Sequence, residues 1–587
     1  MRLLLVYPRL PRDSFWGFDR ALKLSGRRST MPPLGLLTVA GHLPPERFTL
    51  RLADENIGPI TDAEIRWADV VLASGMVAQL EPLEELVARC RKHGTKVVVG
   101  GPLVSGCYAE LLERGFDPDV WFLGEIERLS SEWVQDLERG ELRPVYAHVP
   151  DQEHADQVRS AFGEESRILV EALPALSSSV LPRFDLIDQR HYHSMAVQAS
   201  RGCPIGCEFC DIWKQFGLKS RAVPVEHLCD QLDLLYSLGW RGRVFVVDDN
   251  FIGNVAATRD LLSALQAWQV AERKFSVPAG LRAVLGRKRI RRLRRSFRPH
   301  ASFPFAFSTE ADVRLGADAP KMLALREGMA RAGFNSVFLG IETPSADSLR
   351  EARKKVNIGR EGEATANLLS SVRRIQGAGL EVMAGFILGF DSDPADIDQA
   401  MATFIHEAGI PIAMVGLLGV IPGTALQERL EREGRYLGRL EGTQTHGFRL
   451  NFVPVGRSER VILDQYARVL AAVFGDEQEG MRRFYRRCER AMDALPEAPR
   501  TGDSVGWREV RAFLRSLVRV SPRLQYWAFL LRTLVRSPRF LSYAVVLALQ
   551  GDHLHRLTVA ALEAYRSTRD RQPQAQALPG LVASTEG

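Results

Sequence analysis

The chain has 587 residues and a formal net charge of +6, and 45% of its residues are hydrophobic. This composition is typical of a soluble globular protein with several domains, and so small a net charge does not indicate nucleic-acid binding. No apolar stretch reaches about 18 residues, so no transmembrane helix is predicted, and the N-terminal apolar run is too short for a signal peptide.

Residues 1–143 alternate short apolar runs with helical patterns. The runs expected as strands lie at residues 2–8, 48–56, 68–75, 96–102 and 120–125. This alternation predicts a doubly wound, flavodoxin- or Rossmann-like parallel sheet, which binds ligands at the carboxyl ends of its strands. A stretch rich in Pro, Ser and charged residues follows, and we expect it to be a linker at residues 144–188.

From residue 189 the alternation resumes at a longer spacing. Six runs are expected as strands, at residues 194–202, 243–250, 303–311, 336–343, 381–390 and 413–423. Six strand–helix units predict a partial (β/α)6 barrel over residues 189–457, with functional side chains at the carboxyl ends of the strands. An Arg-rich insert at residues 280–300 is either a solvated loop or a docking site for an acidic surface, such as anionic lipid or a redox partner.

The C-terminal part, residues 458–569, has the pattern of helices. Trp, Phe and Leu mix there with regularly spaced Arg. One interpretation is a helical domain that packs on the barrel. The other is a set of basic amphipathic helices that lie on a membrane surface or form an apolar substrate entrance. Residues 570–587 are expected to be a disordered tail.

Three of the seven cysteines lie within eight residues, in the stretch SRGCPIGCEFCDI. The other four stand singly, which suits a reducing cytosol and argues against disulfides. A structural zinc site normally needs four Cys or His ligands, and no second pair follows closely. Each iron of a [4Fe–4S] cluster is normally held by a thiolate, so Cys203, Cys207 and Cys210 would leave one iron open for chemistry. A zinc or simple redox site stays the alternative.

This loop resembles the cysteine motif of radical S-adenosylmethionine enzymes, including the aromatic Phe209 directly before the third cysteine. The resemblance implies that the three cysteines are catalytic, that the open iron chelates S-adenosylmethionine, and that a 5′-deoxyadenosyl radical results. It also implies contacts to S-adenosylmethionine from the ends of later strands, although the second strand departs from the family's Gly-Gly-Glu element. These contact residues are Asp248, Asp249, Asn250, Glu310, Glu342 and Ile387, and Phe209 of the cysteine loop is a further implied contact. The alternative for each carboxylate is a strand-end cap or a salt bridge.

Beside such a barrel, the N-terminal domain resembles the cobalamin-binding domains of many radical S-adenosylmethionine enzymes, in the segments MPPLGLLTVA, VVGGP and FLGEIE. The implied cobalamin contacts are Pro33, Gly35, Asn56, Gly75, Gly100, Gly101, Gly124 and Glu125. Glycine would let the backbone approach the corrin closely. Asn56 stands where other cobalamin domains carry a cobalt-ligating histidine, so we expect cobalamin without a histidine lower ligand. The alternative is a purely structural domain.

Several segments, among them GWRGRVFVVDDNFIGN and AGLEVMAGFILGFDSD, look like the subfamily that includes the hopanoid C-2 methylases. The resemblance implies a C-methyltransferase that acts on an unactivated carbon of a lipid-like or other small molecule, using a 5′-deoxyadenosyl radical and methylcobalamin. It implies a flavodoxin- or ferredoxin-type reductant as a partner.

Two other functions stay open at this point. One is a cobalamin-dependent radical enzyme that does not methylate, such as a cyclase, a rearrangement enzyme or a hydratase. The other is a non-catalytic iron–sulfur protein. We expect a cytoplasmic protein without a nucleic-acid partner, and a peripheral membrane contact through the basic helices is an open possibility.

Overall fold

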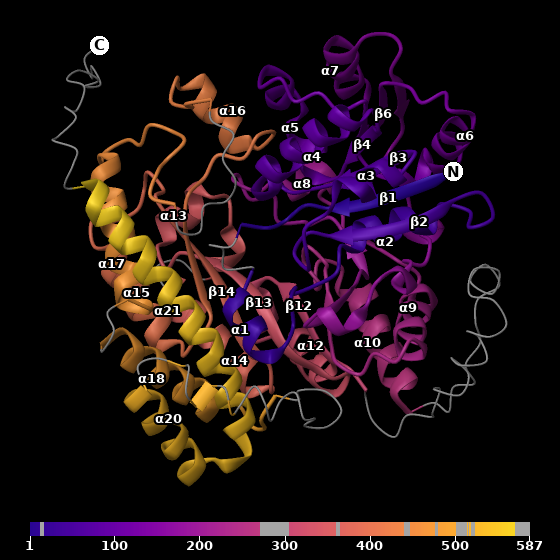
Figure 1. The fold of residues 1–587 in the computed structure, drawn as a ribbon. Helices are drawn as coiled ribbons and strands as arrows, with labels where there is room; N and C mark the ends of the chain where they lie inside the picture. Colours follow the sequence, from indigo (N-terminus) through magenta and orange to yellow (C-terminus); the bar gives the residue numbers. More distant parts are fainter. Residues whose placement is uncertain are drawn as a thin grey trace, which may run out of the picture.

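The structure is a computed structural model, in which two parallel sheets and a group of C-terminal helices make up most of the molecule (Figure 1). It describes residues 1–11, 17–270, 304–359, 364–438, 447–475, 479–499 and 523–569, together with residues 514, 516, 517 and 520. The predicted Arg-rich insert at 280–300 and the predicted tail at 570–587 lie outside the described residues.

The N-terminal sheet has seven parallel strands in the order β2-β1-β3-β4-β5-β6-β7. They are β1 Arg2–Tyr7, β2 Thr49–Asp54, β3 Val70–Ser74, β4 Lys96–Gly100, β5 Val120–Leu123, β6 Val145–Val149 and β7 Arg167–Val170. The order reverses at β1, as in a flavodoxin-like fold, and loops at such a switch point form ligand sites. The predicted doubly wound sheet is therefore confirmed.

Helices cover both faces of this sheet. One face carries α3 (Asp62–Trp67), α4 (Leu80–His93), α5 (Pro102–Glu113) and α7 (Gln152–Phe162). The other carries α2 (Leu34–Gly41) and α6 (Ser130–Arg139). Successive side chains of a strand point to opposite faces, so a strand covered on both sides must be apolar throughout. The run Leu3 to Val6 in β1 is accordingly buried at every position.

The predicted linker at residues 144–188 is wrong in its first half. Residues 145–149 form β6, a fully buried strand, and residues 167–170 form the edge strand β7, with α7 between them. Both strands are short apolar runs, VYAHV and RILV, within a stretch rich in Pro and charged residues, and that composition made the pattern misleading. The other domain limits stay predictions.

The second sheet has six parallel strands in the order β15-β14-β13-β12-β11-β8. They are β8 Ser194–Val197, β11 Arg243–Val246, β12 Ala306–Ala311, β13 Phe334–Glu342, β14 Glu381–Leu388 and β15 Ala413–Leu417. Outer helices include α9 Val225–Ser237, α10 Val255–Val270, α12 Pro320–Arg331, α14 Ala364–Gly377 and α15 Ile397–Glu407. The strands β8 and β15 lie at the two ends of this order, and within the described residues they do not pair with each other. The sheet is therefore the predicted partial barrel.

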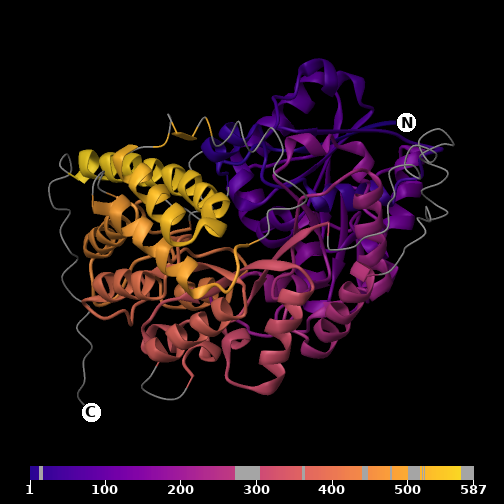
Figure 2. The ribbon, with the colours of Figure 1, turned by 90° about the horizontal axis from the view of Figure 1, so that it is seen from below.

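The C-terminal helices pack against the barrel on the side away from the N-terminal sheet, as Figures 1 and 2 show. They are α17 Glu459–Val473, α18 Glu479–Ala494, α20 Arg523–Arg536 and α21 Leu541–Arg569. The short N-terminal helix α1 (Asp19–Ser25) reaches across to α21, where Arg20 Nε lies 2.5 Å from the buried carboxylate of Asp552. None of the described helices is long and apolar enough to span a bilayer.

Candidate cluster and cofactor site

The three clustered cysteines lie on a loop that follows the first barrel strand. Two short antiparallel strands, β9 (Ser200–Arg201) and β10 (Arg221–Ala222), form a hairpin that closes the loop. Helix α8 (Ile212–Phe216) lies within the loop. The loop begins at Gly202, whose φ is +93° and whose Cβ would lie 2.7 Å from two carbonyl oxygens. Only glycine fits such a turn, so the residue before Cys203 is dictated by the backbone.

The thiols of the loop lie close enough to affect one another. The pKa of Cys207 is raised to about 11, mainly by burial, with Lys354 acting to lower it and Glu342 and the nearby thiol of Cys203 acting to raise it. Burial likewise raises the pKa of Cys210, with contributions from Cys207 and Cys203. Among the described residues, no group of three Cys, His, Asp or Glu side chains could hold a single metal ion. Three neighbouring thiols on one loop fit a [4Fe–4S] cluster, whose thiolate ligands bind separate irons.

The acidic pair after β11 supports this loop. Asp248 is buried and accepts hydrogen bonds from the backbone N–H groups of Ala199 and Ser200, at 2.8 and 2.9 Å, and from the Ser200 hydroxyl at 2.7 Å. Both of its oxygens help to hold the hairpin, and its expected contact with S-adenosylmethionine stays a prediction. Asp249 accepts a 2.7 Å hydrogen bond from Gly202 N and is only half-buried, so its role as a ligand contact stays a prediction.

Asn250 joins the loop to the next strand. Its amide nitrogen lies 2.8 Å from Asp312 Oδ2 and 3.8 Å from Cys203 Sγ. Asp312 in turn is paired with Arg314 at 2.7 Å. The side chain is thus one of the groups that surround the first cysteine, and its contact with S-adenosylmethionine stays a prediction.

Glu310 and Glu342 lie at the carboxyl ends of β12 and β13, as predicted. The pKa of Glu310 is raised to about 7, mainly by burial, with the charges of Asp249 and Glu342 also acting to raise it and Lys354 acting to lower it. These four side chains therefore face a common region beside the cysteine loop. Ile387, near the end of β14, packs half-buried against the barrel core.

Lys354 is a site residue that sequence reasoning missed. Its ammonium lies 2.5 Å from Glu342 Oε1, and both side chains are about 9% exposed. Burial alone would lower the pKa of Lys354, but Glu342 and the thiols of Cys207 and Cys210 raise it overall. A Cβ on Gly340 would lie 2.4 Å from the Lys354 ammonium, so the glycine makes room for the pair.

A second missed contact fastens the middle of the cysteine loop. Glu208 lies between Cys207 and Phe209, is buried, and accepts hydrogen bonds from Arg429 at 3.0 and 3.1 Å. Arg429 belongs to α16 (Ala425–Arg432), which follows the last barrel strand. Phe209 packs near Phe390, with ring centroids 6.3 Å apart. The loop is therefore held from both edges of the open barrel.

At the N-terminal sheet, most predicted cobalamin residues lie at the carboxyl ends of strands. Gly75 follows β3, Gly100 ends β4, and Gly124 follows β5. The chain itself requires two of these glycines, because a Cβ on Gly101 would lie 2.2 Å from Ser74 Oγ and one on Gly124 would lie 2.3 Å from a carbonyl oxygen. Glycine at these two positions is therefore explained by the chain alone. Their location at the carboxyl ends of strands is what fits a ligand site.

Pro33 and Gly35 lie at the start of α2, where Pro33 is buried and Gly35 is exposed with open space around it. Asn56 binds the loop after β1: its amide oxygen accepts from Leu10 N at 2.8 Å, and its amide nitrogen donates to Asp54 Oδ1 at 2.8 Å. The amide is thus engaged within the protein, and its expected contact with cobalamin stays a prediction. An open strand-end edge with glycine backbone fits a flat cofactor such as cobalamin.

Glu125 binds the cysteine hairpin, and its expected contact with cobalamin stays a prediction. Its carboxylate is almost completely buried and pairs with both Arg201, at 3.1 Å, and Arg221. Arg201 also lies 2.8 Å from the buried carboxylate of Glu127. Arg201 comes directly before the turn into the cysteine loop, so this ion network couples the N-terminal sheet to the predicted cluster.

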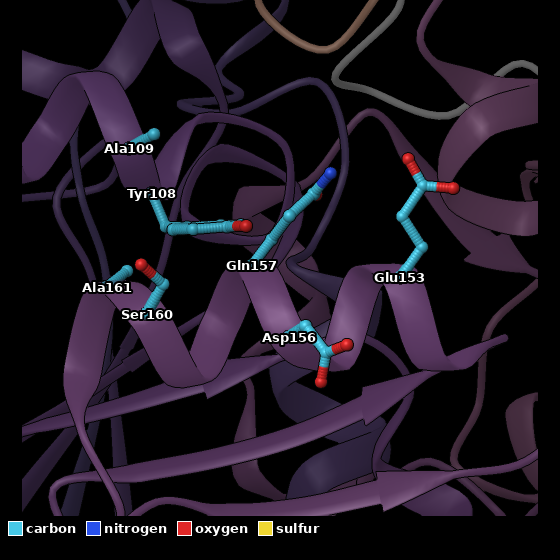
Figure 3. Close-up of a pocket in the computed structure, with 7 residues that line it drawn as sticks. All are labelled: Tyr108, Ala109, Glu153, Asp156, Gln157, Ser160 and Ala161. Carbon is cyan, nitrogen blue, oxygen red and sulfur yellow. The ribbon is translucent and has the colours of Figure 1, made fainter.

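One hollow of the surface lies away from the predicted site. Tyr108 and Ala109 of α5 line it together with five residues of α7, as Figure 3 shows. The side chains in view are Tyr108, Ala109, Glu153, Asp156, Gln157, Ser160 and Ala161. No predicted site residue is among them, and this outer hollow has no part in the site.

Comparisons with known proteins agree with this geometry. A family model described as "B12 binding domain" matches residues 25–130, and one described as "Domain of unknown function (DUF4070)" matches residues 424–567. The chain is 33% identical over 557 residues to an uncharacterized methyltransferase of Synechocystis sp., which covers 94% of this chain and 91% of that protein. The chain belongs to the cobalamin-binding radical S-adenosylmethionine methyltransferases.

Two further similarities concern this family. The methyltransferase is 29% identical over 545 residues to the hopanoid C-2 methylase of Rhodopseudomonas palustris, which covers 91% of this chain and 90% of that protein. Its fold is like that of the cobalamin-dependent S-adenosylmethionine radical enzyme OxsB, solved with aqua-cobalamin and S-adenosylmethionine bound. The TM-score is 0.54 at 15% identity, over 97% of this chain and 81% of that one. The predicted family, enzyme class and cofactors are thereby confirmed.

Replacing Glu125 by alanine should uncouple the two domains of the methyltransferase, because Arg201 and Arg221 lose their shared partner. Breaking a buried ion pair from one side costs about 3–5 kcal/mol. We expect methyl transfer to fall severalfold more than cleavage of S-adenosylmethionine, measured as the ratio of methylated product to 5′-deoxyadenosine. The matched control is Glu171→Ala, which breaks an exposed pair with Arg128 on the same domain. An unchanged ratio in Glu125→Ala would show that the network does not couple the domains.

Proposed function

We propose that this methyltransferase transfers a methyl group to an unactivated carbon of a lipid-like substrate of the hopanoid type. The observation that carries the proposal is the buried network between Glu125 and Arg201, which holds the cobalamin-binding domain against the cysteine hairpin. Such a contact suits a reaction in which two cofactors act on one substrate, because both reactive centres must be held within reach. The similarity to the hopanoid C-2 methylase supports the substrate class.

The cofactors would supply the difficult chemistry: a 5′-deoxyadenosyl radical from the cluster side and a methyl group from cobalamin. Cys203, Cys207 and Cys210 would hold the cluster. Asp249 and Glu310 would attract the cationic groups of S-adenosylmethionine, since a carboxylate beside a buried cation forms a strong charge-assisted contact. The chain's part is to position these groups and to exclude water.

The Lys354–Glu342 pair has a distinct part in this proposal. The Lys354 ammonium interacts electrostatically with the thiols of Cys207 and Cys210, and it would offset the negative charge of the thiolates. A buried cation there favours the ionised form of the ligands that a metal cluster requires. We therefore assign the pair to support of the cluster side of the site.

Binding of S-adenosylmethionine should tighten as the pH rises through about 7. In the free site Glu310 has a pKa of about 7 because it is buried among acidic groups, and a bound cation would lower that pKa. Binding then releases a proton, so the affinity should rise about tenfold between pH 6 and 8. Equilibrium dialysis of the cluster-loaded protein without reductant measures this. Glu310→Gln should bind more weakly and show a flat profile, and an equal slope in both proteins would exclude Glu310 from the contact.

The substrate class is tested by incubating the loaded enzyme with extracted hopanoids and, in parallel, with polar small molecules. We expect a product that is heavier by one CH2 group only in the hopanoid fraction. A methylated polar product without a methylated lipid would contradict the proposed substrate class. A lipid product without added mass would instead indicate a radical reaction other than methyl transfer.

We propose a flavodoxin- or ferredoxin-type protein as the reductant, since the family's chemistry requires a low-potential electron donor.

We also propose a peripheral contact with the membrane in which a lipid substrate would be dissolved. Its support is the mixture of Arg with large apolar residues in the C-terminal helices.

A further inference from the structure

Helix α20 has two apolar faces, and only one of them is covered by the protein. Tyr526, Phe529 and Leu530 are buried on the inner face. The outer face carries large apolar side chains with high exposed fractions: Leu524 85%, Trp527 41%, Leu531 58%, Leu534 49% and Val535 81%. Their spacing of three, four, three and one residues places them on a single stripe of the helix.

Such a stripe is unusual for a protein surface in water. Single exposed apolar side chains are ordinary, but a contiguous row marks an interaction surface. Here the row extends along the whole helix, which is about 21 Å long at 1.5 Å per residue. Figure 1 shows α20 at the lower edge of the molecule, far from the N-terminal sheet. The stripe is therefore accessible to a large, flat partner.

The charged residues of the helix itself and of the turn that follows it are all positive. Residues 523–539 contain four Arg and no Asp or Glu. Arg536 and Arg539 are exposed. Arg532, which is also exposed, reaches back to Glu489 of α18 at 2.7 Å. Guanidinium groups next to a row of Leu, Val and Trp match the two chemical layers of a bilayer surface, where anionic phosphates lie above acyl chains.

We infer that the outer face of α20 docks the enzyme on an anionic membrane surface, with the helix lying in the plane of the interface. A membrane fits better than a second protein because a single helix stripe needs no complementary shape from a fluid lipid layer. The charge complementarity selects anionic lipid as the occupant. The inference deepens the proposed function, since a lipid substrate would be collected at the surface on which the enzyme lies.

The test uses sedimentation of the full-length enzyme with vesicles that hold no hopanoid. One set contains equal parts of phosphatidylglycerol and phosphatidylcholine, and the other contains phosphatidylcholine alone. We expect binding to the anionic vesicles that weakens with added salt, because surface attraction is screened. The double variant Leu531→Glu, Val535→Glu should bind at least about tenfold more weakly, since two charged groups cannot enter the acyl layer.

The control is Leu323→Glu, which changes a similarly exposed leucine on α12. It should bind like the natural protein. Fluorescence gives a second readout: brominated lipid should quench the natural protein more strongly than Trp527→Phe. Equal binding by the α20 variant, or no binding by the natural protein, would overturn the inference. So would a concentration-dependent dimer that the α20 variant dissociates.

The outcome can be separated from that of the proposed function. Methyl transfer to a hopanoid dissolved in detergent needs no docking, so the α20 variant should retain activity there. Loss of vesicle binding with retained detergent activity supports both proposals. Activity without any vesicle binding in the natural protein would leave the substrate class intact and contradict the membrane contact.

Discussion

Cys207→Ala should lose cleavage of S-adenosylmethionine by at least about a thousandfold, as expected when one member of a group that acts as a unit is removed. Cys207 lies in the middle of the loop, where its carbonyl accepts a 2.8 Å hydrogen bond from Trp213 and its thiol neighbours the other two. Two remaining thiols leave a second iron of the cluster without a protein ligand. The measurement is anaerobic formation of 5′-deoxyadenosine, together with the iron and sulfide content.

A matched control separates loss of the cluster from loss of the fold. Cys90→Ala removes an equally small thiol that is completely buried in α4, far along the chain from the loop. It should keep both the cluster and the cleavage activity, with only a modest loss of stability. Cys207→Ala should still bind cobalamin through its N-terminal domain. Retained cleavage in Cys207→Ala would show that the three cysteines do not hold the cluster.

Lys354→Met should destabilise the protein by about 3–5 kcal/mol, because it leaves the buried carboxylate of Glu342 without its partner. The two groups are 2.5 Å apart and both about 9% exposed, so water cannot replace the lost ammonium. Glu342 also has a φ of +66°, a strained value for a side chain other than glycine, and the pair helps to hold it there. Urea unfolding measures the change.

The double variant Lys354→Met, Glu342→Gln is the sharper experiment. Removing both charges should restore most of the stability that the single variant loses, because no unpaired charge remains. The iron and sulfide content should nevertheless be lower in both variants than in the natural protein, because both variants lack the cation beside the thiols. Lys355→Met, which changes the exposed neighbouring lysine, is the control and should affect neither quantity. If the single and double variants are equally unstable, the pair is not a coupled unit.

The parts of the protein that could be predicted are those that depend on local sequence. Apolar residues were enough to predict five strands of the first sheet and the six of the barrel, although β2 and β12 also contain charged residues, Arg51 and Glu310. The cysteine motif is also local, because one loop supplies all three predicted ligands. The strands β6 and β7 were missed although both contain apolar residues, VYAHV and RILV, because Pro and charged residues surround them in the sequence.

The contacts that prediction missed join residues far apart in the chain. Glu125 and Arg201 are separated by 76 residues, and Glu208 and Arg429 by 221. Nothing in either local sequence indicates its partner. The same limit applies to Asp248, because its strand-end position does not indicate that both of its oxygens hold the hairpin. Lys354 was missed because its pairing depends on the backbone of Glu342 and on the small size of Gly340.

The most direct test of the central claim follows two products in one reaction. The protein is loaded anaerobically with iron, sulfide and cobalamin, and is then given S-adenosylmethionine, a strong reductant and hopanoid extract. Chromatography with mass detection quantifies 5′-deoxyadenosine and S-adenosylhomocysteine. A cobalamin-dependent radical methyltransferase should form both, and Cys207→Ala should lose the first. Protein that holds its cluster and cobalamin but forms neither product would contradict the account.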